Sequence, residues 1–384
     1  MSRTRLSVLY AVLAVAAVLA WEALTVRYNF GGDWSALFLT GDLRPVPSEL
    51  AATTRLLPHS SGYDGQWYRY MAYDLFFERG FAKNFDDSRH RYHRFLVPAL
   101  ARLLAFGQDA RTDGAYIAVV MLSLGLGVYW SALWLVARKQ NPAWGLLFLI
   151  LPASLTSIER MLVDATLTAL FAGFLYFAER RMFAPMVIVA CAAALTRETG
   201  GFLIAGLAAH EMYERRYVRC LFAALAAAPT ALWFRFVDAH TPASSAGGIV
   251  TAPIIGLLRR VITIRSFPAS PTVETIFRAI DLWAILGLLA TIVFGLLWCW
   301  YEGPSPATFA TALFALLGLI LGDATHLTEA VGFGRPVSPL ILFVMLRGIA
   351  SREWLSIAAP LGMCIGCGIF YVSPAIRIGR ALLK

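Results

Sequence analysis

The feature that most constrains this chain is a series of long, nearly uninterrupted apolar runs. A helix needs about 20 consecutive apolar residues to cross the hydrocarbon core of a bilayer. Hydrophobic residues make up 59% of the 384 residues, charged residues only 15%, and the mean hydropathy is +0.65. A soluble domain cannot bury so much apolar surface. A transmembrane β-barrel would show short alternating segments instead. The sequence therefore predicts an all-α, polytopic transmembrane protein.

Sliding windows of about 20 apolar residues predict about 11 membrane spans. Basic residues gather at one set of predicted span ends, which the positive-inside rule places in the cytoplasm. The excess of Lys and Arg, 33 against 24 acidic residues, is therefore explained by membrane anchoring and needs no nucleic acid. An odd number of spans would put the basic C-terminal tail outside, so either one short span is miscounted or the tail is an interfacial helix. The spans are expected near residues 6–26, 114–137, 143–158, 163–179, 182–196, 200–214, 218–237, 282–301, 306–322, 336–350 and 354–372.

The whole chain, residues 1–384, is expected to form a single membrane domain, because no segment has the composition of a separate soluble domain. Two long loops face outward in this topology, at residues 27–113 and 238–281. Stretches of mixed polarity in both loops predict amphipathic helices that lie along the membrane surface, near residues 66–77, 95–106 and 249–264.

The first outward loop contains the most informative motif, residues 62–68 (GYDGQWY). Glycines allow backbone to approach a ligand, and Asp64 supplies a carboxylate that can act as a catalytic base. Gln66 and Tyr68 are expected to bind substrate, and the faces of Trp67, Tyr68 and Tyr70 suit a sugar ring. The alternative is an Asx-turn in which Asp64 only hydrogen-bonds its own backbone.

Residues 86–94 (DDSRHRYHR) form a second constellation, shortly before a predicted interfacial helix. Arginine forks and imidazoles suit a phosphate or pyrophosphate, so Arg91, His93 and Arg94 are candidate substrate-binding residues. Lipid headgroups would require the same residue types, and this alternative stays open. A divalent-metal site is a further alternative, because His-x-x-His places two ligands on one helical face. Its ligands would be Asp86, Asp87, His90 and His93.

Ionisable residues also stand at the outward ends of several predicted spans. Charges flanked so closely by apolar helix usually point inward, toward a cavity or a partner. Asp164, Arg197, Glu198 and Arg335 are therefore candidate site residues. The alternative is purely structural pairing, for example between Arg160 and Asp164 at i, i+4.

The order of these motifs resembles that of bacterial GT-C-type integral-membrane glycosyltransferases, relatives of the polyprenyl-phosphate-sugar-dependent mannosyltransferases. The resemblance implies a lipid-linked sugar donor and an acidic catalytic base in the first outward loop, a position that Asp64 fits. Members often carry this acid in a paired acidic motif, whereas this chain has Asp64 alone. By position and charge, the resemblance makes Arg91, Arg94, Arg197 and Arg335 candidate contacts to the donor phosphate. The matching blocks are residues 62–68, 91–98, Pro152 with 159–164, 195–200 and 334–336.

The expected function is therefore transfer of a sugar from a polyprenyl-phosphate donor to a glycan, lipid or protein acceptor of the cell envelope. The expected location is the bacterial inner (plasma) membrane, with the active site facing the periplasm or cell exterior and with membrane lipids as further partners. No cofactor is required by the motifs, although a divalent metal remains the open alternative. The rivals are a membrane acyltransferase, a polyprenyl-linked glycan flippase or transporter, and a non-catalytic partner subunit. Charges gathered at one face, without an internal repeat, favour an enzyme over a transporter.

Overall fold

The computed structural model describes residues 3–243, 252, 254–263, 270–321, 327 and 329–383. Within these residues the chain is predominantly helical, which confirms the all-α prediction. The strands among them are β1 (Thr40–Gly41) and β2 (Leu56–Leu57), which pair in parallel. Because these strands are only two residues long, helix packing determines the fold.

Helices of two kinds, α-helices (α) and 3-10 helices (η), make up most of the described chain. In chain order they are α1 (Arg3–Asn29), η1 (Trp34–Phe38), α2 (Ser48–Ala51), α3 (Asp64–Tyr73), η2 (Phe81–Asn84), α4 (Ser88–Tyr92), α5 (Leu96–Leu104), α6 (Asp109–Ala137), η3 (Pro142–Ile150), α7 (Pro152–Arg160), α8 (Asp164–Glu179), α9 (Phe183–Thr196), η4 (Glu198–Gly200), α10 (Gly201–Tyr213), α11 (Tyr217–Leu225), α12 (Ala228–His240), α13 (Ile255–Ile262), α14 (Pro271–Glu302), α15 (Pro306–Ile320), α16 (Ala330–Gly334), α17 (Ser338–Ser351), α18 (Leu355–Gly368), η5 (Ile369–Tyr371) and α19 (Val372–Leu382).

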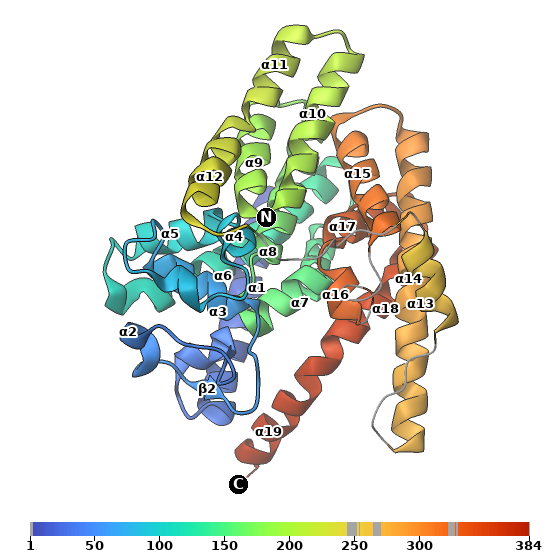
Figure 1. The fold of residues 1–384 in the computed structure, drawn as a ribbon. Helices are drawn as coiled ribbons and strands as arrows, with labels where there is room; N and C mark the ends of the chain where they lie inside the picture. The colour runs from blue at the N-terminus through green and yellow to red at the C-terminus, as the bar shows by residue number, and fades with distance from the viewer. Residues whose placement is uncertain are drawn as a thin grey trace.

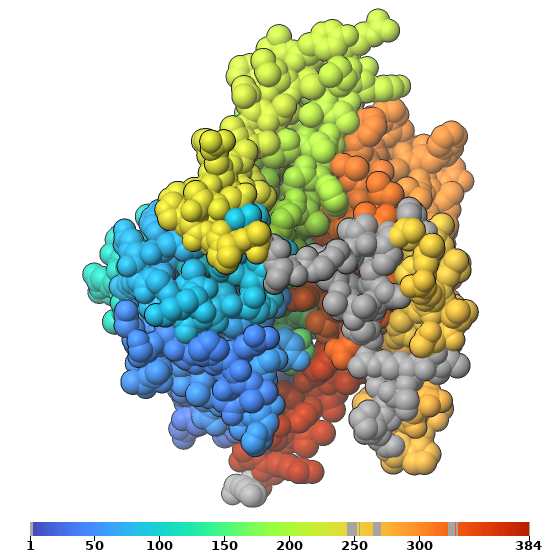
Figure 2. Space-filling view, viewed as in Figure 1, coloured from blue at the N-terminus to red at the C-terminus, as the bar shows by residue number. Residues whose placement is uncertain are grey.

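Helices distant in sequence pack against one another in a bundle (Figure 1). α6 contacts α1 and α8, while α14 contacts α15, α17 and α18. We call residues 34–104, which run from η1 to α5, the N-terminal lobe; it contacts α6 through α3 and α5. In the space-filling view the lobe, blue to cyan, lies on the opposite side from α14 and α15, in orange (Figure 2).

A buried arginine attaches the lobe to the bundle. Arg69 of α3 is only 1% exposed, and its Nε and Nη2 each donate to a carboxylate oxygen of Asp113 in α6 at 2.8 Å. Its Nη1 donates to the Thr54 hydroxyl at 2.6 Å. Such a two-point pair fixes orientation as well as distance. The start of α3, which carries Asp64, is therefore held in a defined position relative to α6.

Five helical stretches within the described residues are long and apolar enough to cross a membrane. They are α1, α6, α11 with α12, α14, and α18 with α19; the bent pair of η3 and α7 would make a sixth. These helices support membrane-spanning character, but helix length does not confirm the predicted count of about 11. Several expected spans are present as shorter helices, because they end on polar groups inside the bundle. For example, α8 begins at buried Asp164, and α9 stops just before Arg197.

The predicted helix near 143–158 is divided into η3 and α7, which meet at an angle of 58°. Pro152 causes the break, because proline lacks an N–H donor and disfavours helical backbone at the preceding residue. Leu151 accordingly has extended angles, with φ −62° and ψ 146°. α14 begins at Pro271 rather than near residue 282, which shortens the second predicted loop.

Of the surface helices predicted for the two long loops, some agree with the structure and one does not. The stretch 66–77 becomes α3, and all of its residues from Gly65 to Tyr73 are buried, so its prediction as an interfacial helix was wrong. Its aromatic side chains pack inside the lobe rather than against lipid. The stretch 95–106 becomes α5, which leaves Leu103, Leu104 and Phe106 exposed. In the second loop α13 forms at Ile255–Ile262, while residues 249–251, 253 and 264 of the prediction lie outside the described residues.

Candidate functional site

Asp64 is the first residue of α3, and the glycines on either side set its position. Gly62 has φ +74°, a conformation that strains residues with a side chain. A Cβ at Gly65 would lie 2.1 Å from the carbonyl oxygen of Arg160, so only glycine allows this close approach to the end of α7. A carboxylate at a helix N-terminus is stabilised by the helix dipole. The motif therefore presents a carboxylate where the lobe meets the bundle.

The Asp64 carboxylate lies between two guanidinium groups. Its Oδ1 is 3.0 Å from Nη1 of Arg91 in α4, and its Oδ2 is 3.3 Å from Nη1 of Arg335, which follows α16. Arg91 also donates to both carboxylate oxygens of Asp86, at 2.8 and 3.1 Å. Segments at opposite ends of the chain therefore meet at Asp64.

Arg335 extends the network toward a second, more deeply buried carboxylate. Its Nη1 lies 3.9 Å from Oδ2 of Asp164, the first residue of α8. The other carboxylate oxygen of Asp164 pairs with Nη1 of Arg197 at the end of α9. The side chains of Asp164 and Arg197 are only 3% and 9% exposed. A buried charge requires such a partner, so this pair joins α8 and α9 beneath the Asp64 site.

A second branch of polar contacts surrounds Arg94. Its guanidinium donates to the Tyr68 hydroxyl and lies 3.6 Å from Oε2 of Glu198. Its Nη2 is 2.8 Å from Nε2 of His90, whose Nδ1 lies 3.7 Å from Oε1 of Glu198. The site thus combines α3, α4, the α7–α8 and α9–η4 junctions and the end of α16. Eight of the ten predicted site residues lie in these two branches: Asp64, Tyr68, Arg91, Arg94, Asp164, Arg197, Glu198 and Arg335.

The charges of the site follow from opposed effects of burial and neighbouring ions. Burial raises the pKa of Asp64, but Arg91 and Arg335 outweigh it and hold that pKa well below its usual range. Burial likewise raises the pKa of Glu198, while Arg94 and His90 reverse the effect and lower it to about 2. Burial and the Arg94 charge lower the pKa of His90 to about 4. At neutral pH both carboxyl groups are therefore ionised, and neutral His90 can accept the Arg94 hydrogen bond at Nε2.

Gln66 and His93 are not part of either branch. Gln66 is buried, accepting a hydrogen bond from the Gly41 N–H at 3.3 Å and donating to the Ser61 carbonyl at 2.9 Å. It therefore stabilises the loop before α3. The His93 ring stacks on Phe234 with centroids 3.9 Å apart, and its Nε2 is 3.3 Å from Asp238. Its position therefore joins the lobe to α12.

The aromatic rings that were predicted to stack on a sugar are buried inside the protein. Trp67, Tyr68 and Tyr70 are at most 3% exposed, because they pack within the lobe and against α6. A sugar cannot stack on faces that protein already covers. The exposed aromatic ring of the motif is Tyr63, which the prediction passed over.

Tyr63 belongs to a stack that sequence reasoning missed. The Arg160 guanidinium lies 3.9 Å from the Tyr63 ring centroid and 4.8 Å from that of Phe370 in η5. Arg160 pairs with Glu159 at 3.1 Å and not with Asp164 as the i, i+4 alternative suggested. Cation–π contacts between residues far apart in the chain follow no fixed spacing in the sequence. Only the fold could therefore reveal this contact.

The proposed metal ligands have separate partners. Asp86 pairs with Arg91, Asp87 caps the N-terminus of α4, His90 faces Arg94, and His93 faces Asp238. Among the described residues, no group of three or more His, Cys, Asp or Glu side chains is arranged to hold a metal ion. The Asp86–His93 segment therefore does not form the metal site that was the alternative interpretation of this motif.

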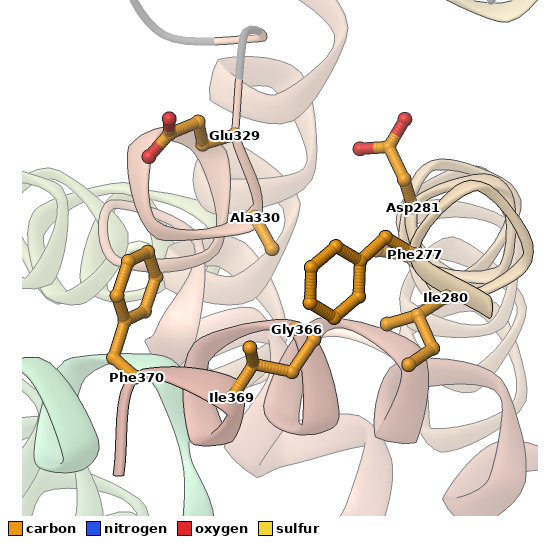
Figure 3. Close-up of a pocket in the computed structure, with 9 residues that line it drawn as sticks. Phe277, Ile280, Asp281, Glu329, Ala330, Gly366, Ile369 and Phe370 are labelled. Atoms are coloured by element: carbon orange, nitrogen blue, oxygen red, sulfur yellow. The ribbon is translucent and has the colours of Figure 1, made fainter. Parts of the chain in front are cut away.

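An apolar cavity of about 230 Å³ lies between α14, α16 and the α18–η5 segment. Figure 3 shows the rings of Phe277 and Phe370 on opposite sides of the hollow, with the Asp281 and Glu329 carboxylates at one edge. Phe370 is the ring on which Arg160 stacks, and α16 leads directly into Arg335. The cavity is thus linked to the Asp64 site through two elements.

Comparison of the chain with protein-family models, with curated proteins and with solved structures found no match. The function of the protein is therefore inferred from the geometry of the polar network and of the cavity beside it.

Replacing Gly65 with alanine is expected to lower the free energy of unfolding by about 1–3 kcal/mol, because the new methyl group meets fixed backbone. The displacement of α3 from α7 should also separate Asp64 from Arg335. The matched control is Gly114→Ala in α6, where a Cβ meets nothing within 4 Å. Alanine there should be neutral or slightly stabilising. Unfolding of both variants in mixed micelles measures the difference, and equal stabilities would contradict the close-approach argument.

Proposed function

We propose that this chain is a GT-C-type membrane glycosyltransferase that moves a sugar from a polyprenyl-phosphate donor to a cell-envelope acceptor. One observation carries the proposal: the Asp64 carboxylate, 23% exposed, lies between Arg91 and Arg335 at the edge of an apolar helical bundle. A carboxylate base beside guanidinium groups matches the needs of a reaction in which a hydroxyl attacks and a phosphate leaves.

In the proposed reaction, the acceptor hydroxyl oxygen attacks the anomeric carbon of the donor sugar. The bond from that carbon to the phosphate oxygen breaks, and polyprenyl phosphate leaves with the bonding electrons. Asp64 takes the proton of the attacking hydroxyl. Arg335 and Arg91 stabilise the charge that develops on the phosphate, because guanidinium forks match phosphate oxygens.

The low pKa of Asp64 fits a resting site rather than the reacting one. With both arginines paired to it, the carboxylate is a weak base. A bound donor phosphate offers the same arginines another anion. As Arg335 and Arg91 turn to the phosphate, the pKa of Asp64 rises and its basicity increases. Donor binding would thereby activate the base, which limits attack on water when no donor is present.

The cavity bounded by Phe277 and Phe370 suits the first part of a polyprenyl chain, because its lining is mostly apolar. The donor phosphate would then lie near Arg335 while the chain remains at the level of the membrane. In this arrangement the site faces the periplasm or exterior of a bacterial inner membrane. The shorter helices, among them α8, α9, α15 and α17, complete the bundle as further spans around the polar network.

The direct test is sugar transfer by the purified protein in detergent or proteoliposomes. The protein is supplied with polyprenyl-phosphate sugars of several kinds and with cell-envelope glycans and lipids as acceptors. We expect transfer from a lipid-phosphate sugar and none from the corresponding nucleotide sugar. Failure of every donor with folded, lipid-bound protein would contradict the proposal and favour a flippase or a partner subunit.

A further inference from the structure

A second group of ionisable residues lies at the other end of the helices that carry the Asp64 site. α8 runs from Asp164 at the site to Glu179, and its 16 residues span about 24 Å. Near Glu179 a polar cavity of about 310 Å³ opens between α9, α10, α11 and the turn from α14 to α15. It is therefore separated from the Asp64 site by most of the thickness of a bilayer core.

Arginines line one part of this cavity. Arg181, Arg216 and Arg219 are all exposed side chains at or near its mouth. Arg216 lies 3.3 Å from Glu214, and the Arg219 guanidinium lies 5.3 Å from the Phe183 ring centroid. Arginines in such positions can bind phosphate oxygens from the solvent side.

Another part of the cavity presents a buried carboxylate. Glu211 is 2% exposed, and its Oε2 accepts no hydrogen bond from any described residue. Arg216 Nη1 lies at the long distance of 4.0 Å from this oxygen. The neighbouring His210 Nδ1 is also buried and has no hydrogen-bond partner in the described part of the chain. A buried polar atom left in this state is destabilising, so a ligand with hydrogen-bond donors would be stabilising here.

The surroundings place this cavity at a membrane surface. The α10–α11 hairpin, at the top of Figure 1, exposes Tyr213, Tyr217, Val218, Leu221 and Phe222. Exposed aliphatic and aromatic side chains beside arginines are typical of the boundary between acyl chains and headgroups. A ligand in the cavity can therefore keep acyl chains outside, against this hairpin.

We propose that this cavity binds a phosphoethanolamine group, the headgroup of an aminophospholipid. Its ammonium donates hydrogen bonds to Oε2 of Glu211, and its phosphate pairs with Arg216 and Arg219. A headgroup with phosphate but no ammonium would bring negative charge toward Glu211 without a cation to balance it. A trimethylated ammonium would supply charge but no N–H. Both ends of phosphoethanolamine are therefore required, and the site is independent of sugar transfer at Asp64.

The test is lipid binding to the detergent-purified full chain, followed by native mass spectrometry and thermal unfolding. Phosphatidylethanolamine should bind at least about 10-fold more tightly than phosphatidylglycerol or phosphatidylcholine. Glu211→Gln should abolish this preference, while Glu353→Gln, an exposed control, should keep it. Arg219→Ala should weaken the binding of both phosphatidylethanolamine and phosphatidylglycerol. This variant provides the test if Glu211→Gln does not fold.

Soluble phosphoethanolamine distinguishes the source of the group. If only the lipid binds, the site takes a membrane headgroup; if the soluble compound binds equally well, it takes a free ligand of the same chemistry. A wild-type protein that binds the three lipids equally would overturn the proposal. So would a Glu211→Gln variant that keeps the preference.

Discussion

Asp64→Asn is expected to reduce sugar transfer by about 10²- to 10⁴-fold, the usual contribution of a general base. Asparagine has nearly the same shape, but it offers one acceptor oxygen to the two guanidinium groups and cannot take the proton of the acceptor hydroxyl. The rate of transfer from a polyprenyl-phosphate sugar measures the effect. The loss should fall on kcat, because donor binding depends mainly on the arginines and the apolar cavity.

The control is Asp238→Asn, which removes an exposed carboxylate that pairs with Arg89 and His93 away from the network. It should retain most of the activity. Because the folded pKa of Asp64 lies below the unfolded value, its stabilising effect is present above about pH 4 and is lost as pH falls through the folded pKa. The difference in stability between wild type and Asp64→Asn should therefore be constant from pH 5 to 8. Unchanged transfer in Asp64→Asn would remove this residue as the base.

Asp164→Ala is expected to cost about 3–5 kcal/mol of stability and to abolish transfer. The substitution leaves the buried Arg197 guanidinium without its carboxylate, and an uncompensated buried charge is far more costly than the loss of a surface pair. It also removes an anion 3.9 Å from Arg335, so that Arg335 should shift toward Asp64. Unfolding in mixed micelles measures the stability.

Two variants make this prediction specific. Glu49→Ala removes an exposed partner of Arg79, 3.4 Å away, and should cost at most about 1 kcal/mol. The double variant Asp164→Leu with Arg197→Met removes both buried charges and should recover most of the lost stability without recovering activity. If the single and double variants are equally unstable, the cost comes from packing around α8 and not from the ion pair.

Much of the secondary structure could be predicted from local pattern. The run at 114–137 became α6 and the run at 306–322 became α15, because an apolar segment satisfies its backbone groups within a helix and no proline interrupts either run after its first turn. The number of spans could not be obtained in the same way. Helices such as α8 and α9 are shorter than the thickness of the hydrocarbon core of a membrane. They end on polar side chains that neighbouring helices enclose.

The candidate site could be predicted in part for a similar reason. A charge beside an apolar run must find a partner, so Asp164 and Arg197 could be selected without knowing which residue each would pair with. The partners themselves were mispredicted where local spacing was used: Arg160 pairs with Glu159 and stacks on Tyr63, and the suggested i, i+4 pair with Asp164 is absent. Gln66 and the aromatic residues after it looked like substrate contacts because sequence does not distinguish an exposed face from a buried one.

The sequence alone determined that this chain has the long apolar helices of a membrane protein, and that Asp64 lies in a motif flanked by glycines. These properties depend on residues near one another in the chain. Only the tertiary structure decided that Arg91, Arg335 and Asp164 form one network with Asp64, and that an apolar cavity adjoins it. It also decided that Glu211 is buried at the opposite end, with an oxygen that accepts no hydrogen bond from the described residues. Such contacts depend on how α3, α4, α8 and α16 pack, and long-range packing leaves no periodic pattern in the sequence.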